Sequence, residues 1–175
     1  HVHLRRQRQM CIRDRGTSHD EYARYTEDGN INAETLMRLM RKFRTASELV
    51  PPPIIEINGE DSCGIIYYGS SKPAVLEAKD ILKTKDINVD LMQIRSFPFN
   101  LDVWEFIASH DRIYVVEQNR DSQMRTLIMA EGGISAEILR PLVHFTGDPI
   151  EASYIVNKIS EREVNYKSHK NIKER

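Results

Sequence analysis

The residues of this 175-residue chain that are best placed to do chemistry are four polar side chains directly after an apolar run. The run covers residues 113–116 and reads as a buried strand, whose end orients side chains better than a free loop does. This position favours a contact to another domain or subunit, whereas turn residues followed by a helix start explain the same side chains equally well. The four residues are Glu117, Gln118, Asn119 and Arg120.

A second polar group lies near the beginning of the chain, where residues 16–32 show neither the period of a helix nor that of a strand. His19 lies in this segment, with Thr17 and Asp20 close to it. A polar segment without periodicity is usually a solvated linker, but a loop held by a rigid scaffold also carries recognition groups. Two interpretations of Thr17, His19 and Asp20 therefore stay open, a linker and a part of an active site.

The remaining candidate sites have plainer explanations. The segment from Gly69 to Ser71 lacks both G-x-G-x-x-G and G-x-x-x-x-G-K-[ST], so the usual cradles for dinucleotides and nucleoside triphosphates are not encoded there. Ser70 and Ser71 are better explained as helix caps, although a helix N-terminus also accepts a small anion. Cys11 and Cys63 form no C-x-x-C pattern, and we predict neither a catalytic residue nor a metal site in this chain.

These candidate sites need elements to position them, and apolar runs supply four candidate strands. Ile65, Val89 and Ile113 lie 24 residues apart, which fits one strand and one crossover helix per unit. Because the runs are continuously apolar, both faces of the sheet are expected to be covered. The sequence therefore predicts a three-layer α/β/α fold with a mostly parallel sheet of four or five strands. The runs cover residues 65–68, 89–94, 113–116 and, more weakly, 142–145.

Helical segments lie before and between these runs. Asn32 is expected to cap the first helix, which the proline run from Pro51 ends. Before the last helix, Asp148, Pro149 and Glu151 match a capping box. The other helix starts are expected at Ser70 or Ser71, at Asn100, and at Asp121 or Ser122.

Four regions follow from these patterns. Residues 16–52 form a linker and one helix, residues 53–162 form the α/β domain, and residues 163–175 form a polar tail. Residues 1–15 are expected to be foreign, because residues 10–14 resemble the translation of a transposase adapter used to prepare sequencing libraries. An arginine-rich targeting peptide and a basic nucleic-acid arm are the rival interpretations. On the first interpretation, the chain starts in the middle of a longer protein.

Charge and hydropathy argue against several classes of protein. Residues 1–15 hold five arginines and one aspartate, and removing this +4 from the net charge of −1 leaves −5 for the rest. A negative folded part argues against nucleic acid as a partner. No apolar run approaches the roughly 20 residues that a membrane span needs, so no membrane association is predicted. The lack of a cysteine framework predicts a cytoplasmic location.

Three separate segments resemble the alpha subunits of 2-oxoacid:ferredoxin oxidoreductases, and the 2-oxoglutarate members fit best. The first, at residues 15–28, contains Gly-Thr-Ser-His-Asp-Glu-Tyr. The second is Gly-Ile-Ile-Tyr-Tyr-Gly-Ser-Ser at residues 64–71, and the third is Ile-Tyr-Val-Val-Glu-Gln-Asn-Arg-Asp at residues 113–121. Each segment alone is weak evidence, but their common order makes the resemblance specific. It covers nearly all of residues 16–159.

The resemblance implies a transketolase C-terminal-like fold for the α/β domain and a place in a thiamine-diphosphate enzyme. Such enzymes decarboxylate a 2-oxoacid oxidatively and give acyl-CoA, carbon dioxide and reduced ferredoxin. The resemblance also implies that a beta subunit supplies the pyrophosphate and Mg²⁺ site and that iron-sulfur clusters pass electrons to ferredoxin. Coenzyme A and ferredoxin are then partners of the whole complex. This chain alone is expected to bind no cofactor and to be inactive.

The resemblance also assigns roles to the two polar groups. It places the segment with Thr17, His19 and Asp20 near the 2-oxoacid pocket, where these side chains would shape or polarise it. It gives residues 117–120 a role in positioning domains or subunits. Two further interpretations stay open: a free-standing α/β interaction module, and the matching domain of another thiamine enzyme such as transketolase. The polar groups at residues 19–22 and 117–120 favour the oxidoreductase over the latter.

Overall fold

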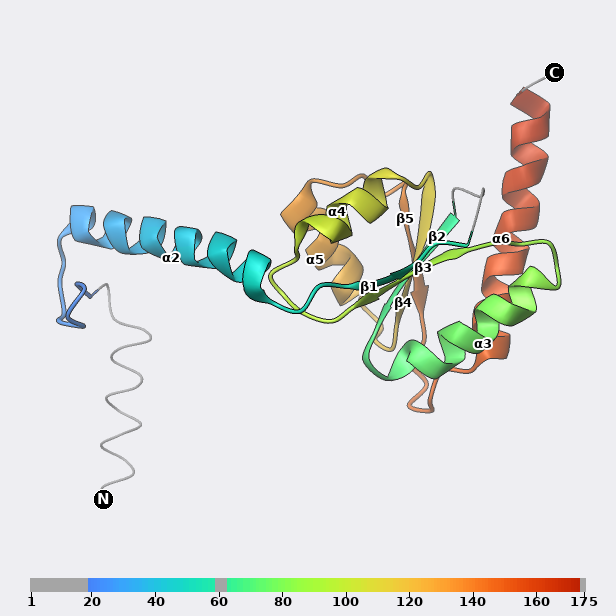
Figure 1. The fold of residues 1–175 in the computed structure, drawn as a ribbon, viewed down its shortest axis with the longest axis horizontal. Helices are drawn as coiled ribbons and strands as arrows, with labels where there is room; N and C mark the ends of the chain where they lie inside the picture. Colours follow the sequence, from blue (N-terminus) through green and yellow to red (C-terminus); the bar gives the residue numbers. More distant parts are fainter. Residues whose placement is uncertain (1–18, 59–62, 174–175) are drawn as a thin grey trace. The chain divides into compact units, whose positions relative to one another are not determined.

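The computed structural model describes residues 19–58 and 63–173 (Figure 1). The segment expected to be foreign, residues 1–15, and the candidate residue Thr17 lie outside the described residues. The chain divides into two compact units between Leu49 and Val50, close to the predicted boundary at residue 52.

The first unit consists of a short hairpin, residues 19–25, and one long helix. This helix, α2, spans Gly29–Leu49. The predicted cap Asn32 lies inside α2, because the Asp28 carboxylate accepts a hydrogen bond from the Asn30 backbone N–H at 2.8 Å and so begins the helix earlier. None of the 21 residues of α2 is buried, although the helix is amphipathic.

The second unit is built on a five-stranded sheet with the strand order β1-β3-β2-β4-β5 (Figure 1). The last four strands in the chain are parallel to one another, and β1 pairs antiparallel with β3. This arrangement confirms the predicted mostly parallel sheet. β1 was not predicted, because three residues after a proline run carry too little periodic signal. The strands are β1 Ile54–Glu56, β2 Cys63–Tyr68, β3 Asp90–Ile94, β4 Arg112–Glu117 and β5 Leu139–Val143.

Helices cover both faces of this sheet, which confirms the predicted three layers. α3 and α6 pack against each other on one face, and α4 and α5 lie on the other face (Figure 1). Successive strand residues point to opposite faces, so Ile65 belongs to the core cluster under α3 and α6, whereas Ile66 belongs to the cluster under α4 and α5. The helices are α3 Lys72–Lys83, α4 Leu101–Ala108, α5 Gln123–Gly132 and α6 Ala152–Lys173.

Three helices begin where the sequence patterns predict, directly after Ser71, Asn100 and Ser122, whereas the last helix begins later than predicted. Asn100 caps α4 as predicted, since its Oδ1 accepts a hydrogen bond from the Asp102 backbone N–H at 2.8 Å. The capping box predicted from Asp148 does not begin a helix, because α6 starts only at Ala152. Ile150, between these two residues, is buried in the core, and this burial holds the connection in a non-helical conformation.

The C-terminal helix continues through the region predicted to be a polar tail, residues 163–175, as far as Lys173. Glu163 is only 1% exposed. Its carboxylate accepts hydrogen bonds from Arg112 Nε at 3.0 and 2.8 Å and from the Tyr114 hydroxyl at 2.8 Å. Burial and the neighbouring Glu163 carboxylate raise the pKa of Tyr114, which keeps this hydroxyl protonated as a donor. A buried ion pair therefore joins α6 to β4.

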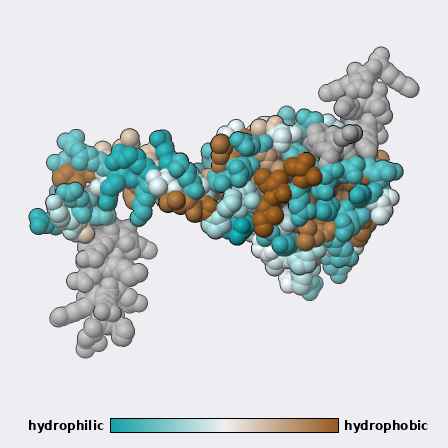
Figure 2. Space-filling model, viewed as in Figure 1, coloured by the Kyte–Doolittle hydropathy of each residue, from teal (hydrophilic) through white to brown (hydrophobic). Residues whose placement is uncertain are grey.

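Exposed apolar side chains occur in both units. On α2, Leu36 and Met40 are each 54% exposed. On the edge strand of the second unit, Ile54 and Ile55 are 40% and 37% exposed, and Ile57 after the strand is 63% exposed. Figure 2 shows hydrophobic residues gathered over β1. Groups of exposed apolar side chains of this kind are typical of surfaces that contact another protein part.

Candidate functional site: a closed strand-end edge and a hairpin pocket

The strand order predicts where a ligand crevice would lie in the second unit. The chain passes from β2 to β3 on one side and later returns to β4 on the other side of β2. Connections therefore diverge at the carboxyl ends of β2 and β4, which is the usual ligand site of open α/β sheets. Residues 117–120 lie at this point, and the 3-10 turn Gly69–Ser71 follows β2 at the same edge.

Side-chain hydrogen bonds from Gln118 connect the loops at this edge. Gln118 Nε2 donates to Ser70 Oγ at 3.1 Å and to Ser71 Oγ at 3.2 Å. Its Oε1 accepts a hydrogen bond from the Ile150 backbone N–H at 3.4 Å. Gln118 thus links the connections that follow β2, β4 and β5. The predicted helix start is confirmed, since Ser71 is the N-cap residue of α3 and Pro73 lies in the first turn, although Ser71 makes no side-chain cap bond.

Glu117 is fully buried and caps α5 from the end of the preceding strand. Its carboxylate accepts hydrogen bonds from the backbone N–H groups of Met124 and Arg125 at 2.8 and 2.9 Å, and from Asn119 Nδ2 at 2.8 Å. The expected cap Ser122 has a left-handed backbone, with φ of 50°, and makes no side-chain cap bond. A carboxylate is favoured here because a helix N-terminus carries partial positive charge.

The Arg120 side chain is 74% exposed. Its Nε donates to the adjacent Asp121 carboxylate at 2.7 Å, so the guanidinium lies in solvent. Asn119 instead faces inward, and its Nδ2 also donates to the Tyr68 hydroxyl at 3.4 Å. Burial, followed by the negative charge of Glu117, raises the pKa of Tyr68. Arg120 thus presents an exposed positive charge at this edge, while Glu117 and Asn119 bond to the protein itself.

In the first unit, His19 and Asp20 lie in the hairpin beside the beginning of α2. Asp20 Oδ1 accepts hydrogen bonds from the backbone N–H groups of Tyr22 and Arg24 at 2.9 and 2.8 Å. One carboxylate oxygen of Asp20 therefore fixes the shape of the loop. The Thr35 hydroxyl of α2 donates to the His19 carbonyl oxygen at 3.3 Å, which ties the hairpin to the helix.

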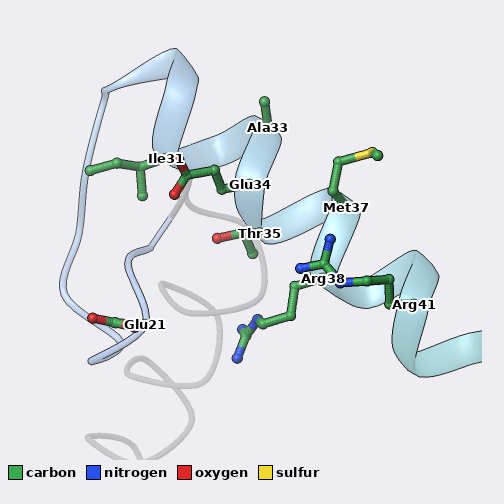
Figure 3. A pocket seen from close by; sticks show the side chains of 8 residues that line it. All are labelled: Glu21, Ile31, Ala33, Glu34, Thr35, Met37, Arg38 and Arg41. Atoms are coloured by element: carbon green, nitrogen blue, oxygen red, sulfur yellow. The ribbon is translucent and has the colours of Figure 1, made fainter. Parts of the chain in front are cut away.

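A pocket of about 670 Å³ lies between this hairpin and α2 (Figure 3). Figure 3 shows the side chains of Arg38 and Arg41 extending from the same side of the helix, with Glu21 on the hairpin across from them. Sequence reasoning missed this pocket because charged residues on an amphipathic helix read as a solvated face. The available signal was the spacing of three between the two arginines, which places them on one side. The lining residues are Glu21, Ile31, Ala33, Glu34, Thr35, Met37, Arg38 and Arg41.

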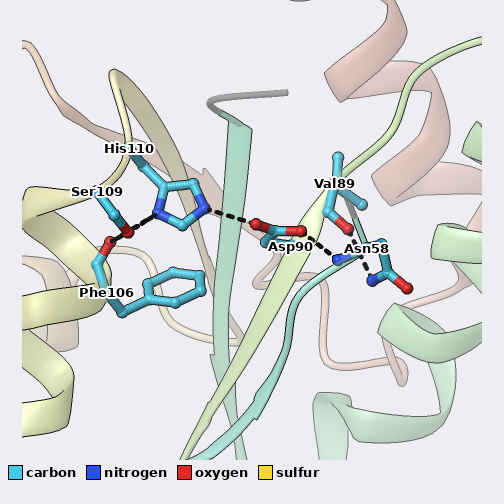
Figure 4. A network of polar contacts seen from close by, with 6 residues as sticks. All are labelled: Asn58, Val89, Asp90, Phe106, Ser109 and His110. Atoms are coloured by element: carbon cyan, nitrogen blue, oxygen red, sulfur yellow. Dashed lines mark hydrogen bonds and ion pairs between the residues drawn. The ribbon is translucent and has the colours of Figure 1, made fainter. Parts of the chain in front are cut away.

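A buried histidine–aspartate pair in the second unit has a structural role (Figure 4). His110 Nε2 lies 3.3 Å from Asp90 Oδ2, and its Nδ1 lies 2.6 Å from the Phe106 carbonyl oxygen. Asp90 Oδ1 accepts a hydrogen bond from the Asn58 backbone N–H at 2.6 Å. The His110 and Asp90 side chains are 2% and 8% exposed. Both ring nitrogens face acceptors inside the protein, so the pair joins the elements around it.

Within residues 19–58 and 63–173, no three His, Cys, Asp or Glu side chains are grouped so that they could hold a metal ion. None of the helices described there is both long and apolar enough to cross a bilayer. The candidate sites are thus the hairpin pocket and the exposed edge at Arg120.

The fold is a doubly wound α/β fold with a mostly parallel five-stranded sheet. The sequence is 28% identical over 155 residues to the alpha subunit of 2-oxoacid:ferredoxin oxidoreductase 2 from Aeropyrum pernix, covering 83% of this chain and 24% of the relative. It is also 28% identical over 124 residues to a 2-oxoacid:ferredoxin oxidoreductase subunit alpha from Saccharolobus solfataricus, covering 68% of this chain and 20% of the relative. No family model matches the sequence.

A solved structure shows the same fold. It is the 2-oxoglutarate:ferredoxin oxidoreductase from Magnetococcus marinus with 2-oxoglutarate, coenzyme A and succinyl-CoA bound, at a TM-score of 0.70 and 23% identity, covering 82% of this chain and 25% of that chain. The predicted resemblance is therefore confirmed, since the relatives are alpha subunits of 2-oxoacid:ferredoxin oxidoreductases. The chain spans about a quarter of the length of the curated relatives that it matches.

Proposed function

We propose that this chain is the transketolase C-terminal-like part of the alpha subunit of a 2-oxoacid:ferredoxin oxidoreductase. The enzyme would decarboxylate 2-oxoglutarate or a similar 2-oxoacid oxidatively, form acyl-CoA and reduce ferredoxin in the cytoplasm. The observation that carries the proposal is the similarity to curated alpha subunits over 83% and 68% of the chain. The closed strand-end edge supports a scaffold role for this region, since its polar side chains bond to one another.

The complex is proposed to use thiamine diphosphate, Mg²⁺ and iron-sulfur clusters, with a beta subunit, coenzyme A and ferredoxin as partners. The described residues do not fit a diphosphate cradle at the carboxyl end of β2, because Ser70 and Ser71 contact Gln118 there. Nor do they group carboxylate or histidine side chains for a metal ion, within the ranges that the structure covers. We therefore assign the cofactor site to the beta subunit, and assembly and pocket closure to this region.

The proposal is tested by co-purifying the full-length alpha subunit with the beta subunit encoded beside it. The complex is then assayed with 2-oxoglutarate, pyruvate and a branched-chain 2-oxoacid, using ferredoxin or a viologen as electron acceptor. We expect acceptor reduction that depends on both the 2-oxoacid and coenzyme A. A stable complex without such activity would overturn the proposal, and binding to an unrelated protein alone would favour the free-standing interaction module.

The proposed role of the hairpin predicts that Asp20→Ala raises the KM for the 2-oxoacid. Loss of the two hydrogen bonds to Tyr22 and Arg24 would release the loop that carries His19. An effect of 1–2 kcal/mol corresponds to roughly a 5- to 30-fold change. Asp20→Asn is the matched control, because its side-chain oxygen still accepts both bonds. Steady-state kinetics of the complex that are unchanged by Asp20→Ala across several 2-oxoacids would contradict this role.

The exposed edge predicts that Arg120→Ala weakens association with the beta subunit. We expect roughly a tenfold increase in Kd, the equivalent of about 1.4 kcal/mol, without loss of stability, because the side chain is solvent-exposed. Lys83→Ala removes the same charge from the last turn of α3, at the opposite end of the sheet. Isothermal titration with the purified beta subunit measures both Kd values. Equal values for the two variants would show that Arg120 makes no specific contact.

A further inference from the structure

We propose that Arg38 and Arg41 form an anion-binding subsite in the pocket between the hairpin and α2, which takes a carboxylate or phosphate group of a ligand. This inference rests on the proposed function and adds a ligand chemistry to the first unit. The two arginines line the same pocket of about 670 Å³ (Figure 3). They lie outside the segments that carry the family resemblance in the sequence.

The spacing of the two arginines places two positive charges on the same side of α2, in the lining of one pocket. Residues three apart in a helix are neighbours on its surface, and like charges at such spacing destabilise the helix. An anion shared by both guanidinium groups removes this repulsion. Guanidinium groups also present planar pairs of N–H donors, which match the oxygens of carboxylates and phosphates.

The structure leaves both guanidinium groups available for such a ligand. Among residues 19–58 and 63–173, the ion pairs with an N···O distance of up to 4.0 Å involve other arginines, Arg112, Arg120 and Arg140. Arg38 and Arg41 therefore have no carboxylate partner within the described part of the chain. An arginine side chain that lines a pocket without a carboxylate partner can bind an external anion, because no ion pair has to be broken first.

The position of the pocket connects the subsite to the proposed 2-oxoacid site. The Thr35 hydroxyl is part of the pocket lining and donates to the His19 carbonyl oxygen at 3.3 Å. An anion bound by Arg38 and Arg41 would thus lie beside the segment proposed to face the 2-oxoacid. Two ligands of the proposed reaction carry suitable groups: the second carboxylate of a dicarboxylic 2-oxoacid and the phosphates of coenzyme A.

Glu21 and Glu34 also line the pocket, and their charge is opposite to that of the two arginines. Their negative charges repel an anion, so the wild-type pocket binds it less tightly than the two arginines alone would. Removing one of these charges should therefore strengthen binding, whereas removing an arginine weakens it. A pocket with only a structural role would not respond in opposite directions to these two changes.

The experiment compares four variants of the intact alpha–beta complex: Arg38→Gln, Arg41→Gln, Glu34→Gln and Arg44→Gln. Arg44 is exposed on the same helix but does not line the pocket, so Arg44→Gln is the matched control. KM and kcat are measured with 2-oxoglutarate, pyruvate and coenzyme A each varied in turn. Urea unfolding of each variant confirms that the fold is retained.

A dicarboxylate ligand predicts that Arg38→Gln and Arg41→Gln raise the KM for 2-oxoglutarate roughly tenfold and leave those for pyruvate and coenzyme A unchanged. A phosphate ligand predicts that the KM for coenzyme A rises instead, with either 2-oxoacid. In both cases Glu34→Gln lowers the affected KM. The subsite would be overturned if the arginine variants left the KM values for 2-oxoglutarate, pyruvate and coenzyme A unchanged, or if they lowered kcat alone. Either result would leave the proposed function intact. A wild-type complex without 2-oxoacid-dependent activity would overturn both.

Discussion

Replacing Glu163 with alanine is expected to lower the free energy of unfolding by about 3–5 kcal/mol, because it removes the buried carboxylate that balances the charge of Arg112. Arg112 and Glu163 are 7% and 1% exposed at their side chains, and Arg112 Nη2 lies 2.8 Å from Glu163 Oε2. The Tyr114 hydroxyl loses its acceptor in the same variant. The measurement is equilibrium urea unfolding of the 175-residue chain, followed by circular dichroism.

Two controls distinguish the loss of the ion pair from a change in helix propensity as the cause of the lower stability. Glu161→Ala changes an exposed glutamate of the same helix and should alter stability by less than about 0.5 kcal/mol. The double variant Arg112→Met with Glu163→Leu removes both charges and should recover most of the loss, since well-packed apolar residues often replace a buried pair without cost. A single variant as stable as Glu161→Ala would show that α6 is not held by this pair.

Replacing Asp90 with alanine is expected to lower the free energy of unfolding by about 2–4 kcal/mol, because it removes a buried carboxylate that contacts two other segments of the chain. Asp90 Oδ1 accepts a hydrogen bond from the Asn58 backbone N–H at 2.6 Å, and Asp90 Oδ2 lies 3.3 Å from His110 Nε2. These contacts join the segment after β1 to the start of β3 and to the connection between α4 and β4 (Figure 4). Urea unfolding again gives the value.

The matched control for this site is Asp90→Asn, which keeps an acceptor for Asn58 and should cost less than Asp90→Ala. Asp80→Ala, an exposed change on α3, should be close to neutral. Gly64→Ala tests the same region from β2, since an added Cβ would lie 3.0 Å from the Phe106 ring and 3.2 Å from His110 Cδ2. Equal stability of Asp90→Ala and Asp80→Ala would contradict a structural role of the pair.

The layers and the parallel strands of this protein are readable from sequence because buried strands form continuous apolar runs. The runs at residues 65–68, 89–94 and 113–116 coincide with β2, β3 and β4. The extent of α6 is not readable in this way. Glu163 looks like a residue of a polar tail, and its burial is favourable because the distant Arg112 and Tyr114 bond to its carboxylate.

For the candidate sites, too, the position of a residue along the chain could be predicted, but its contacts with distant residues could not. Position alone indicated that residues 117–120 lie at a strand end, but not that Glu117 caps a helix seven residues away. Gln118 was also recognised as polar, while its bonds to Ser70 and Ser71 depend on the adjacency of β2 and β4. The hairpin pocket depends on a contact between Thr35 and His19, sixteen residues apart.

The exposed apolar face of α2 is expected to affect how fast the protein is degraded in a cell. A helix of 21 residues without a buried side chain gains little from packing, so it depends on association for its stability. Until that association occurs, Leu36 and Met40 offer the kind of surface that chaperones and proteases act on. We therefore expect unassembled copies to be degraded faster than assembled ones, which would keep the amount of this chain matched to that of its partner.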